Sequence, residues 1–261
     1  MYLNTKAFRE RMNAGRLCLG PGITFADPAV TESLGPSVDF VWIDLEHNPT
    51  DLQTMMGHLV AARAVGTMAM VRVPSGEIGW IKRVLDSGAE GIILPQAQSY
   101  EDVAKFVSAC RYPPLGTRGF GPRRPTNYAR MPADEYLASA NRDLFVVAQI
   151  ESSGALQDLD RIVRLPGLDS LVIGPFDLSG SLGILGQLDH PKLTDAVRRI
   201  ISVGREAGLY MGMGMGASED FAIRAAKMGL HWMQVGNDFE YMNAFADRLY
   251  EGVRRRLSEA T

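Results

Sequence analysis

Short apolar runs alternate with longer amphipathic segments along the whole chain of 261 residues. The apolar runs predict eight strands, at residues 18–20, 40–44, 68–73, 91–94, 145–150, 170–173, 210–212 and 232–235. Between them, apolar residues spaced three and four apart predict helices, including 51–65, 78–87, 101–110, 156–164 and 191–207. Eight strand-and-helix units in about 260 residues favour one (β/α)8 barrel domain over residues 1–261.

Three features of the architecture stay open at this level. A doubly wound open sheet competes with the barrel, but the first strand-to-helix turn, LGPGITFADP, lacks the GxGxxG arrangement of dinucleotide sites. The connection 111–142 is long and polar, and loops of that length are usually functional or disordered. Residues 238–259 predict a long helix that packs on its own barrel or on a neighbouring subunit.

Composition and charge narrow the class of protein. Apolar residues make up 46% and charged residues 22% of the chain, which is typical of a globular domain. The net charge of −3 comes from interspersed charges of both signs, so we expect no nucleic-acid or anionic-membrane partner. The sequence has no signal-peptide pattern and no apolar run of about 18 residues. Cys18 and Cys110 belong to no metal or redox motif, so we expect buried thiols and a cytoplasmic protein.

Two acidic residues close or follow consecutive apolar runs. Glu151 ends the fifth predicted strand and Asp177 follows the sixth. In a barrel, both would point into the mouth formed by the C-terminal strand ends. Two carboxylates without several Cys or His nearby suit an oxygen-preferring cation, Mg²⁺ or Mn²⁺. Acidic residues are also common helix caps, and that structural alternative is about as well supported by position alone.

A histidine and an arginine occupy two other strand ends. His47 directly follows the second strand and can serve as a general base near neutral pH, or it is a loop histidine facing solvent. Asp86 could orient its imidazole, or it is a helix-surface carboxylate. Arg72 ends an apolar strand, where it could stabilise an oxyanion or enolate, or form a salt bridge to Asp44 or Glu46.

The segment IGPFDLSGSLG predicts a carboxylate-binding turn. Pro175 suits the first turn of a helix, which leaves free backbone N–H groups around Phe176 and Asp177. All lysines fall in helix-like or terminal segments, so none is placed at a strand end to form a Schiff base with a carbonyl substrate. Carbanion chemistry at this site would therefore need a metal.

These motifs together resemble the HpcH/HpaI family of class II, pyruvate-dependent aldolases. The resemblance covers nearly the whole chain and rests on IDLEHNP, MVRVP, RVLDSGAEGIILPQAQS, RYPPLGTRGFG, QIES and IGPFDLSGSLG, in the family's order and spacing. It implies a lyase that splits 4-hydroxy-2-oxo acids into pyruvate and an aldehyde through a pyruvate enolate. It further implies a Mg²⁺, Mn²⁺ or Co²⁺ cofactor and a homo-oligomer, often a hexamer arranged as a trimer of dimers with exchanged last helices.

The resemblance also implies roles for individual residues. Glu151 and Asp177 match the metal ligands, His47 the general base, Arg72 the enolate stabiliser, and Asp86 the carboxylate that raises the basicity of the histidine. Gln149 matches a substrate-contacting glutamine, and the backbone of Gly174, Pro175, Phe176 and Asp177 matches the site for the pyruvate carboxylate.

Two departures from the family's pattern leave the acceptor open. The second strand ends in DLEH, where the family often has a glycine before the glutamate, and Arg123 and Arg124 stand where better-known members have small residues. Two other functions compete with the aldolase. One is a CoA-thioester lyase of the malyl-CoA or citryl-CoA type, which would need those arginines as a basic groove. The other is a non-catalytic barrel that binds 2-oxo acids.

Overall fold

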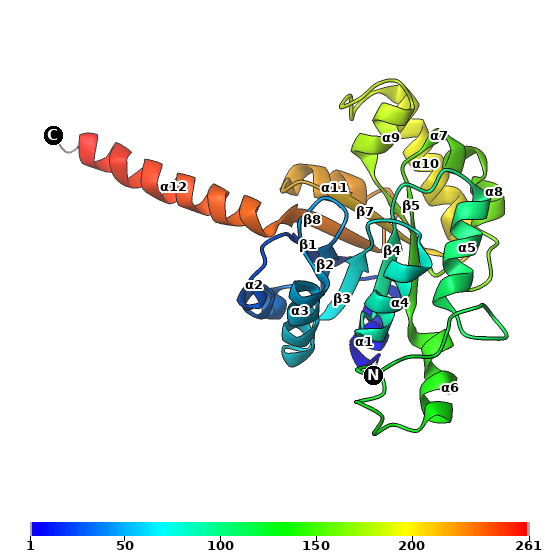
Figure 1. Cartoon of the computed structure of the whole chain (residues 1–261). Coiled ribbons are helices and arrows are strands. Elements are labelled where there is room, and N and C mark those ends of the chain that lie inside the picture. Colours follow the sequence, from blue (N-terminus) through cyan, green and yellow to red (C-terminus); the bar gives the residue numbers. More distant parts are fainter. Residues whose placement is uncertain (1, 260–261) are drawn as a thin grey trace.

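The computed structural model describes residues 2–259, and its centre is a closed barrel of eight parallel strands in chain order (Figure 1). The strands are β1 (Cys18–Ile23), β2 (Phe40–Asp44), β3 (Met68–Arg72), β4 (Gly91–Leu94), β5 (Phe145–Ile150), β6 (Ser170–Ile173), β7 (Tyr210–Met215) and β8 (Trp232–Asn237). Each strand pairs in parallel with the next, and β8 pairs with β1. The (β/α)8 prediction is confirmed, and the open-sheet alternative is wrong.

The helices surround the barrel and close one end of it. They are α1 (Leu3–Asn13), α2 (Pro28–Leu34), the 3-10 turn η1 (Gly35–Ser37), α3 (Leu52–Ala64), α4 (Ile78–Asp86), α5 (Tyr100–Cys110), α6 (Ala133–Asp143), α7 (Ser153–Gln157), α8 (Leu159–Ile162), α9 (Pro175–Ser181), α10 (Pro191–Glu206), α11 (Glu219–Ala226) and α12 (Asp238–Ser258). The helix predicted at 156–164 is instead the pair α7 and α8, which meet at Asp158.

Aromatic packing seals the end of the barrel where the strands begin. Phe8 of α1 lies edge-on to Phe40 at the start of β2 and to Phe145 at the start of β5, with ring centroids 5.5 and 5.6 Å apart. Phe40 packs in turn against Trp232, and all four side chains are fully buried. Because this end is filled, a substrate can enter only at the other end, where the strands finish.

The long connection 111–142 is ordered and includes α6, on the same side of the molecule as α1 (Figure 1). Buried Arg111 holds its start, because its guanidinium donates to Asp169 Oδ2 at 2.6 Å and to the carbonyl of Asn141 at 2.7 Å. Buried Arg124 donates to the carbonyls of Leu59 and Ser87. The connection is therefore fixed to the closed end of the barrel.

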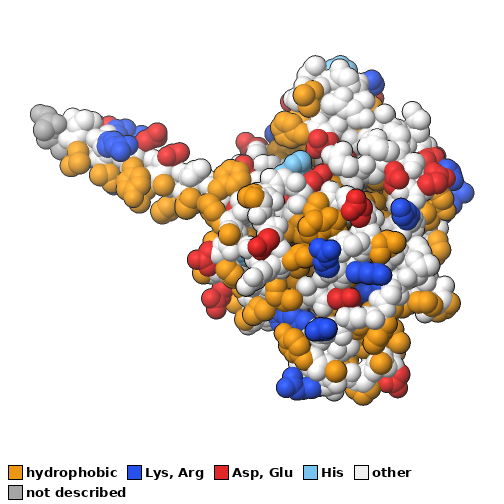
Figure 2. Space-filling view, viewed as in Figure 1, with side chains coloured by type: hydrophobic (Ala, Val, Ile, Leu, Met, Phe, Trp, Pro, Cys, Tyr) orange, Lys and Arg blue, Asp and Glu red, His pale blue; other side chains and the backbone are white. Residues whose placement is uncertain are grey.

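The last helix, α12, projects away from the barrel (Figure 1). Within its described residues, Asp238 alone is buried. Apolar side chains remain exposed along it, visible as an orange stripe in Figure 2, and they include Phe245, Leu249, Tyr250, Val253 and Leu257. No helix among residues 2–259 has the length and apolar character that crossing a membrane requires.

Candidate active site

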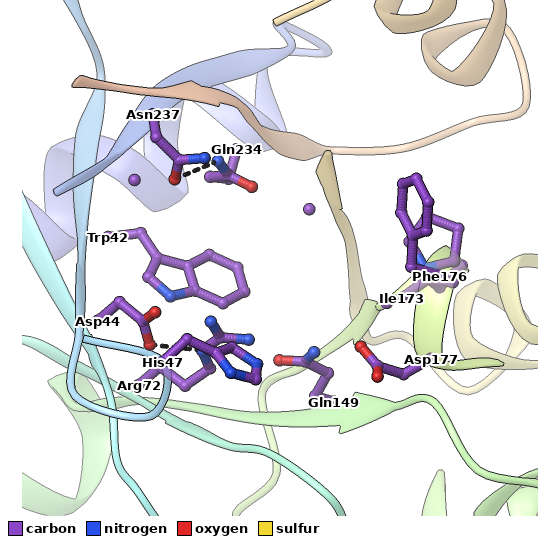
Figure 3. Close-up of a pocket in the computed structure, with 14 residues that line it drawn as sticks. Trp42, Asp44, His47, Arg72, Gln149, Ile173, Phe176, Asp177, Gln234 and Asn237 are labelled. Carbon is purple, nitrogen blue, oxygen red and sulfur yellow. Dashed lines mark hydrogen bonds and ion pairs between the residues drawn. The ribbon is translucent and has the colours of Figure 1, made fainter. Parts of the chain in front are cut away.

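A cavity of about 180 Å³ lies at the open end of the barrel (Figure 3). Its volume is below the roughly 300–1,000 Å³ of sites for drug-sized ligands, so it suits a small substrate. The lining comes from seven strands, the residues that follow them and the start of α9: Gly22, Trp42, Asp44, His47, Arg72, Gln149, Ile173, Gly174, Pro175, Phe176, Asp177, Gly214, Gln234 and Asn237.

Asp177 lines this cavity, Glu151 lies near enough for the charge of Asp177 to act on it, and neither residue is a helix cap. Glu151 is buried, with Oε1 accepting from the backbone N–H of Gln96 at 2.6 Å and Oε2 accepting from the side chain of Gln149. Ser152 caps α7 with its own hydroxyl, and Gly174 holds the N-cap position of α9. Asp177 therefore stands in the first turn of α9 with its carboxylate facing the cavity.

The charge of Asp177 disfavours the charged form of Glu151. Burial raises the pKa of Glu151 to about 7, and the negative charges of Glu46 and Asp177 raise it further against the hydrogen bond from Gln96. Gly174 stands so close that a Cβ there would lie 2.6 Å from Glu151 Oε2. Gln149 Oε1 is buried and accepts no hydrogen bond from the described part of the chain. A cation between the carboxylates would relieve their repulsion.

This donor set fits a hard divalent cation. Carboxylate and amide oxygens are the ligands that Mg²⁺ and Mn²⁺ prefer. Within residues 2–259, no group of three or more His, Cys, Asp and Glu side chains is arranged to hold a metal. The protein would therefore supply two carboxylates, and waters and a chelating substrate would occupy the remaining positions of an octahedron.

Arg72 forms salt bridges to Asp44 and Glu46 and also lines the cavity. Its Nε donates to Asp44 Oδ1 at 2.8 Å, and its Nη1 lies 3.0 Å from Glu46 Oε2. The guanidinium carbon stands 5.2 Å from the centre of the Trp42 ring. Burial raises the pKa of Glu46, although the charge of Arg72 opposes this. The salt bridges of Arg72 are therefore compatible with a role in stabilising an enolate, since one edge of a guanidinium can bind carboxylates while another edge donates to a substrate.

His47 and Asp86 lie at opposite ends of the barrel. His47 lines the cavity, and its Nε2 is 3.6 Å from Glu46 Oε2. Asp86 ends α4, which runs back from the open end, and its Oδ1 accepts from Arg118 at 2.9 Å. The structure does not bring Asp86 to His47 within one chain. The carboxylate that accompanies the imidazole is Glu46.

The start of α9 presents backbone donors to the same cavity. Pro175 occupies the first helical position, and the N–H of Leu178 donates to the carbonyl of Gly174 at 3.0 Å. The N–H groups before Leu178 therefore face out of the helix end, where an anionic group can accept from them. Phe176 is 55% exposed at the rim, on the right of Figure 3.

A family model described as HpcH/HpaI aldolase/citrate lyase matches residues 25–244. The chain belongs to this family. It is 35% identical to a hydroxypyruvate/pyruvate aldolase of Roseovarius nubinhibens, over 90% of this chain and 91% of that one. It is 34% identical to a 4-hydroxy-2-oxo-heptane-1,7-dioate aldolase of Salmonella typhimurium, over 98% of both chains. The crystal structure of an HpcH/HpaI aldolase/citrate lyase family protein from Burkholderia cenocepacia superposes with a TM-score of 0.89 at 29% identity, over 95% of this chain and 99% of that one.

Four polar or aromatic lining residues of this family member have no counterpart in the sequence-based predictions for the site. Trp42 and Asp44 lie on β2, Gln234 lies on β8, and Asn237 ends β8. Gln234 is a buried polar residue within an apolar strand, and that pattern was the available signal. Its orientation toward the cavity depends on the register of β8 in the closed barrel, which the sequence alone does not define.

Proposed function

We propose that this chain is a pyruvate aldolase that cleaves 4-hydroxy-2-oxo acids into pyruvate and an aldehyde and also catalyses the reverse aldol addition. The observation that carries the proposal is that His47, Arg72 and Asp177 line one small cavity in a member of this family, and that the buried carboxylate of Glu151 lies near enough for the charge of Asp177 to act on it. The site combines two carboxylates, the imidazole of His47 as a base and the positively charged guanidinium of Arg72, and enolate-forming chemistry needs these groups together.

Glu151 and Asp177 would hold a divalent cation, Mg²⁺, Mn²⁺ or Co²⁺. When bound, such a cation withdraws charge from the carboxylate and keto oxygens of a 2-oxo acid, so that the bond beyond C3 breaks more easily. Gln149 would orient the substrate, because its Nε2 is bound to Glu151 while its Oε1 remains free to accept. The N–H groups at the start of α9, at Phe176 and Asp177, would receive the substrate carboxylate.

The protein's own side chains would move the proton and stabilise the charge. His47 takes the proton of the 4-hydroxyl as the bond between C3 and C4 breaks, and the bonding electrons pass to the pyruvate enolate. The guanidinium of Arg72 stabilises the negative charge of the enolate oxygen. Glu46, 3.6 Å from His47 Nε2, stabilises the imidazolium that forms. The proton held by His47 then passes to C3, which gives pyruvate, and the aldehyde leaves.

Two features favour this reaction over the alternatives. No lysine of the described chain lines the cavity, in keeping with a site that does not form a Schiff base. A CoA-thioester lyase would need a basic groove beside the cavity, but the guanidinium of Arg124 is bound to backbone carbonyls at the closed end of the barrel.

Release of pyruvate from a racemic 4-hydroxy-2-oxo acid tests the proposal. We expect cleavage with Mg²⁺, Mn²⁺ or Co²⁺, loss of cleavage after chelation, and recovery when the metal returns. His47→Ala should lower kcat by roughly 10²- to 10⁴-fold while metal binding is retained. The matched control is His190→Asn, which keeps a side-chain cap on α10 outside the cavity. Undiminished cleavage by chelated enzyme or by His47→Ala would refute the proposal.

We also propose that the protein is a homo-oligomer, a hexamer built as a trimer of dimers, with α12 packed on a neighbouring copy. The exposed apolar side chains of α12, among them Phe245, Leu249 and Val253, support this arrangement, since a second surface must cover them in water. The cytoplasmic location and the absence of nucleic-acid and membrane partners stay predictions.

A further inference from the structure

The side of the cavity opposite the carboxylates is polar but uncharged. Gln234 and Asn237 project into it from β8, whereas Gln149 stands on β5 and Asp177 on α9 (Figure 3). In a closed barrel with strands in chain order, β8 and β1 lie across from β5. A substrate whose 2-oxo acid part is bound at Glu151 and Asp177 would therefore extend its far end toward the two carboxamides.

Two glycines make room for these carboxamides. A methyl group at Gly22 would overlap Asn237 Oδ1, and one at Gly214 would lie 3.1 Å from Gln234 Oε1 and 3.7 Å from the Trp42 ring. Both glycines line the cavity themselves. Gly22 on β1 and Gly214 on β7 thus place no side chain beside Gln234 and Asn237, so the two carboxamides border the open space of the cavity.

Hydrogen bonds hold both carboxamides in one orientation. Gln234 Oε1 accepts from the N–H of Met215 at 2.9 Å, while its Nε2 donates to the carbonyl of Gly236 at 2.6 Å and, more weakly, to Asn237 Oδ1 at 3.4 Å. Asn237 Nδ2 donates to Glu240 Oε2 at 3.0 Å. The oxygen of Gln234 keeps a second lone pair, and Asn237 keeps a second N–H, whereas the Asn237 oxygen is also engaged by the capping box at the start of α12.

This arrangement suits a hydroxyl group better than a carboxylate. A hydroxyl can donate to the Gln234 oxygen and accept from the Asn237 N–H, so it matches both the free acceptor and the free donor. A carboxylate needs donors or a cation. Among the described residues that line the cavity, His47 and Arg72 are the basic ones, and the proposed reaction already uses both of them at the 2-oxo acid part of the substrate.

We infer that Gln234 and Asn237 are specificity-determining residues that select a short aldehyde bearing a hydroxyl group next to its carbonyl. The inference rests on the proposed function. In the addition direction, pyruvate loses a C3 proton, C3 bonds to the aldehyde carbon, and the aldehyde oxygen gains a proton. The acceptor's own hydroxyl takes no part in this balance and serves only for recognition by the carboxamides.

The test compares two acceptors that differ by one hydroxyl, glycolaldehyde and acetaldehyde, in aldol addition with pyruvate. The measured quantity is the ratio of their kcat/KM values in wild type and in Gln234→Met, which has a similar length and no amide. We expect the ratio to fall by about tenfold in Gln234→Met, the effect of about one hydrogen bond. Gly214→Ala, which crowds Gln234 Oε1, should lower it in the same direction. Gln53→Met, on the exposed face of α3, should leave it unchanged.

Exchange of the C3 protons of pyruvate with deuterated solvent distinguishes failure of the proposed function from failure of the inference about Gln234 and Asn237. The exchange requires enolate formation but no acceptor aldehyde. Wild type without exchange would overturn the proposed function and this inference with it. Exchange accompanied by the same acceptor ratio in wild type, Gln234→Met and Gly214→Ala would overturn the inference alone. A wild-type preference for succinic semialdehyde over glycolaldehyde would also overturn it. Exchange with a ratio that collapses in both variants supports it.

Discussion

Adding one methyl group at Gly174 should disable the site while leaving the fold intact. A Cβ at this position would lie 2.6 Å from Glu151 Oε2 and 2.9 Å from Gln149 Nε2, against 3.4 Å or more for an ordinary contact. The carboxylate must therefore retreat by about 0.8 Å. The backbone of Gly174, at φ −100° and ψ 91°, is open to alanine. The strain thus falls on two flexible side-chain ends and not on the main chain.

The expected result for Gly174→Ala is a fall in kcat/KM of about 100-fold, because displacing a reacting or ligating group by about 1 Å costs on that order. The melting temperature should stay within a few degrees of wild type. Steady-state pyruvate release and thermal denaturation measure the two quantities. The matched control is Gly79→Ala in α4, where a Cβ would meet no atom within 4 Å. It should keep full activity and gain about 0.5–1 kcal/mol of stability. A Gly174→Ala enzyme with wild-type kcat/KM would refute the geometry proposed for the site.

Three further predictions concern stability and assembly. Arg72→Met leaves Asp44 without its buried partner and should cost about 3–5 kcal/mol in denaturant unfolding. Burial raises the pKa of Glu90 to about 7 from 4.5, so the folded state binds the proton more tightly than the unfolded state does. The free energy of unfolding should therefore fall as the pH rises from 4.5 to about 7. Glu90→Gln should remove that fall, about 3 kcal/mol between pH 4 and 8. Paired Phe245→Glu and Leu249→Glu changes should reduce the mass measured by sedimentation.

A specific experimental result would contradict each of these three predictions. Unchanged unfolding of Arg72→Met would show that the pair with Asp44 is worth little. Identical pH profiles for wild type and Glu90→Gln would place the titration in another group. A monomeric wild-type protein would refute the covering of α12 by a second copy. A His47→Ala enzyme, which alters the cavity alone, should match wild type in all three measurements and serves as the control.

The sequence predicted the strands best where apolar residues fill both faces. Strands β2, β4, β5 and β6 begin and end at the predicted residues, and all are buried along their length. Strands β1, β7 and β8 continue further, to Ile23, Met215 and Asn237. Their ends contain glycine, which has little strand preference of its own. Pairing with neighbouring strands holds Gly22 and Gly214, whereas Gly236 has a φ of 76° and lies where the pairing of β8 with β1 is irregular.

The candidate site was predictable to the extent that its residues close apolar runs, as Glu151, Arg72 and His47 do. The break between α7 and α8 was not predictable, because Asp158 accepts from the backbone of Tyr100 in another part of the chain. The separation of Asp86 from His47 follows from the direction of α4, which carries its last residue to the closed end. Contacts of this kind depend on tertiary structure and leave no local pattern.

The cation site at Glu151 and Asp177 is the central claim, and anomalous diffraction from crystals soaked with Mn²⁺ and pyruvate tests it most directly. We predict an anomalous peak between the two carboxylates, in contact with an oxygen from each, at a Mn²⁺ concentration that supports pyruvate release. The peak should disappear in Glu151→Gln crystals grown in the same form. A peak elsewhere in the barrel, or full activity at that concentration with no peak between Glu151 and Asp177, would contradict the account.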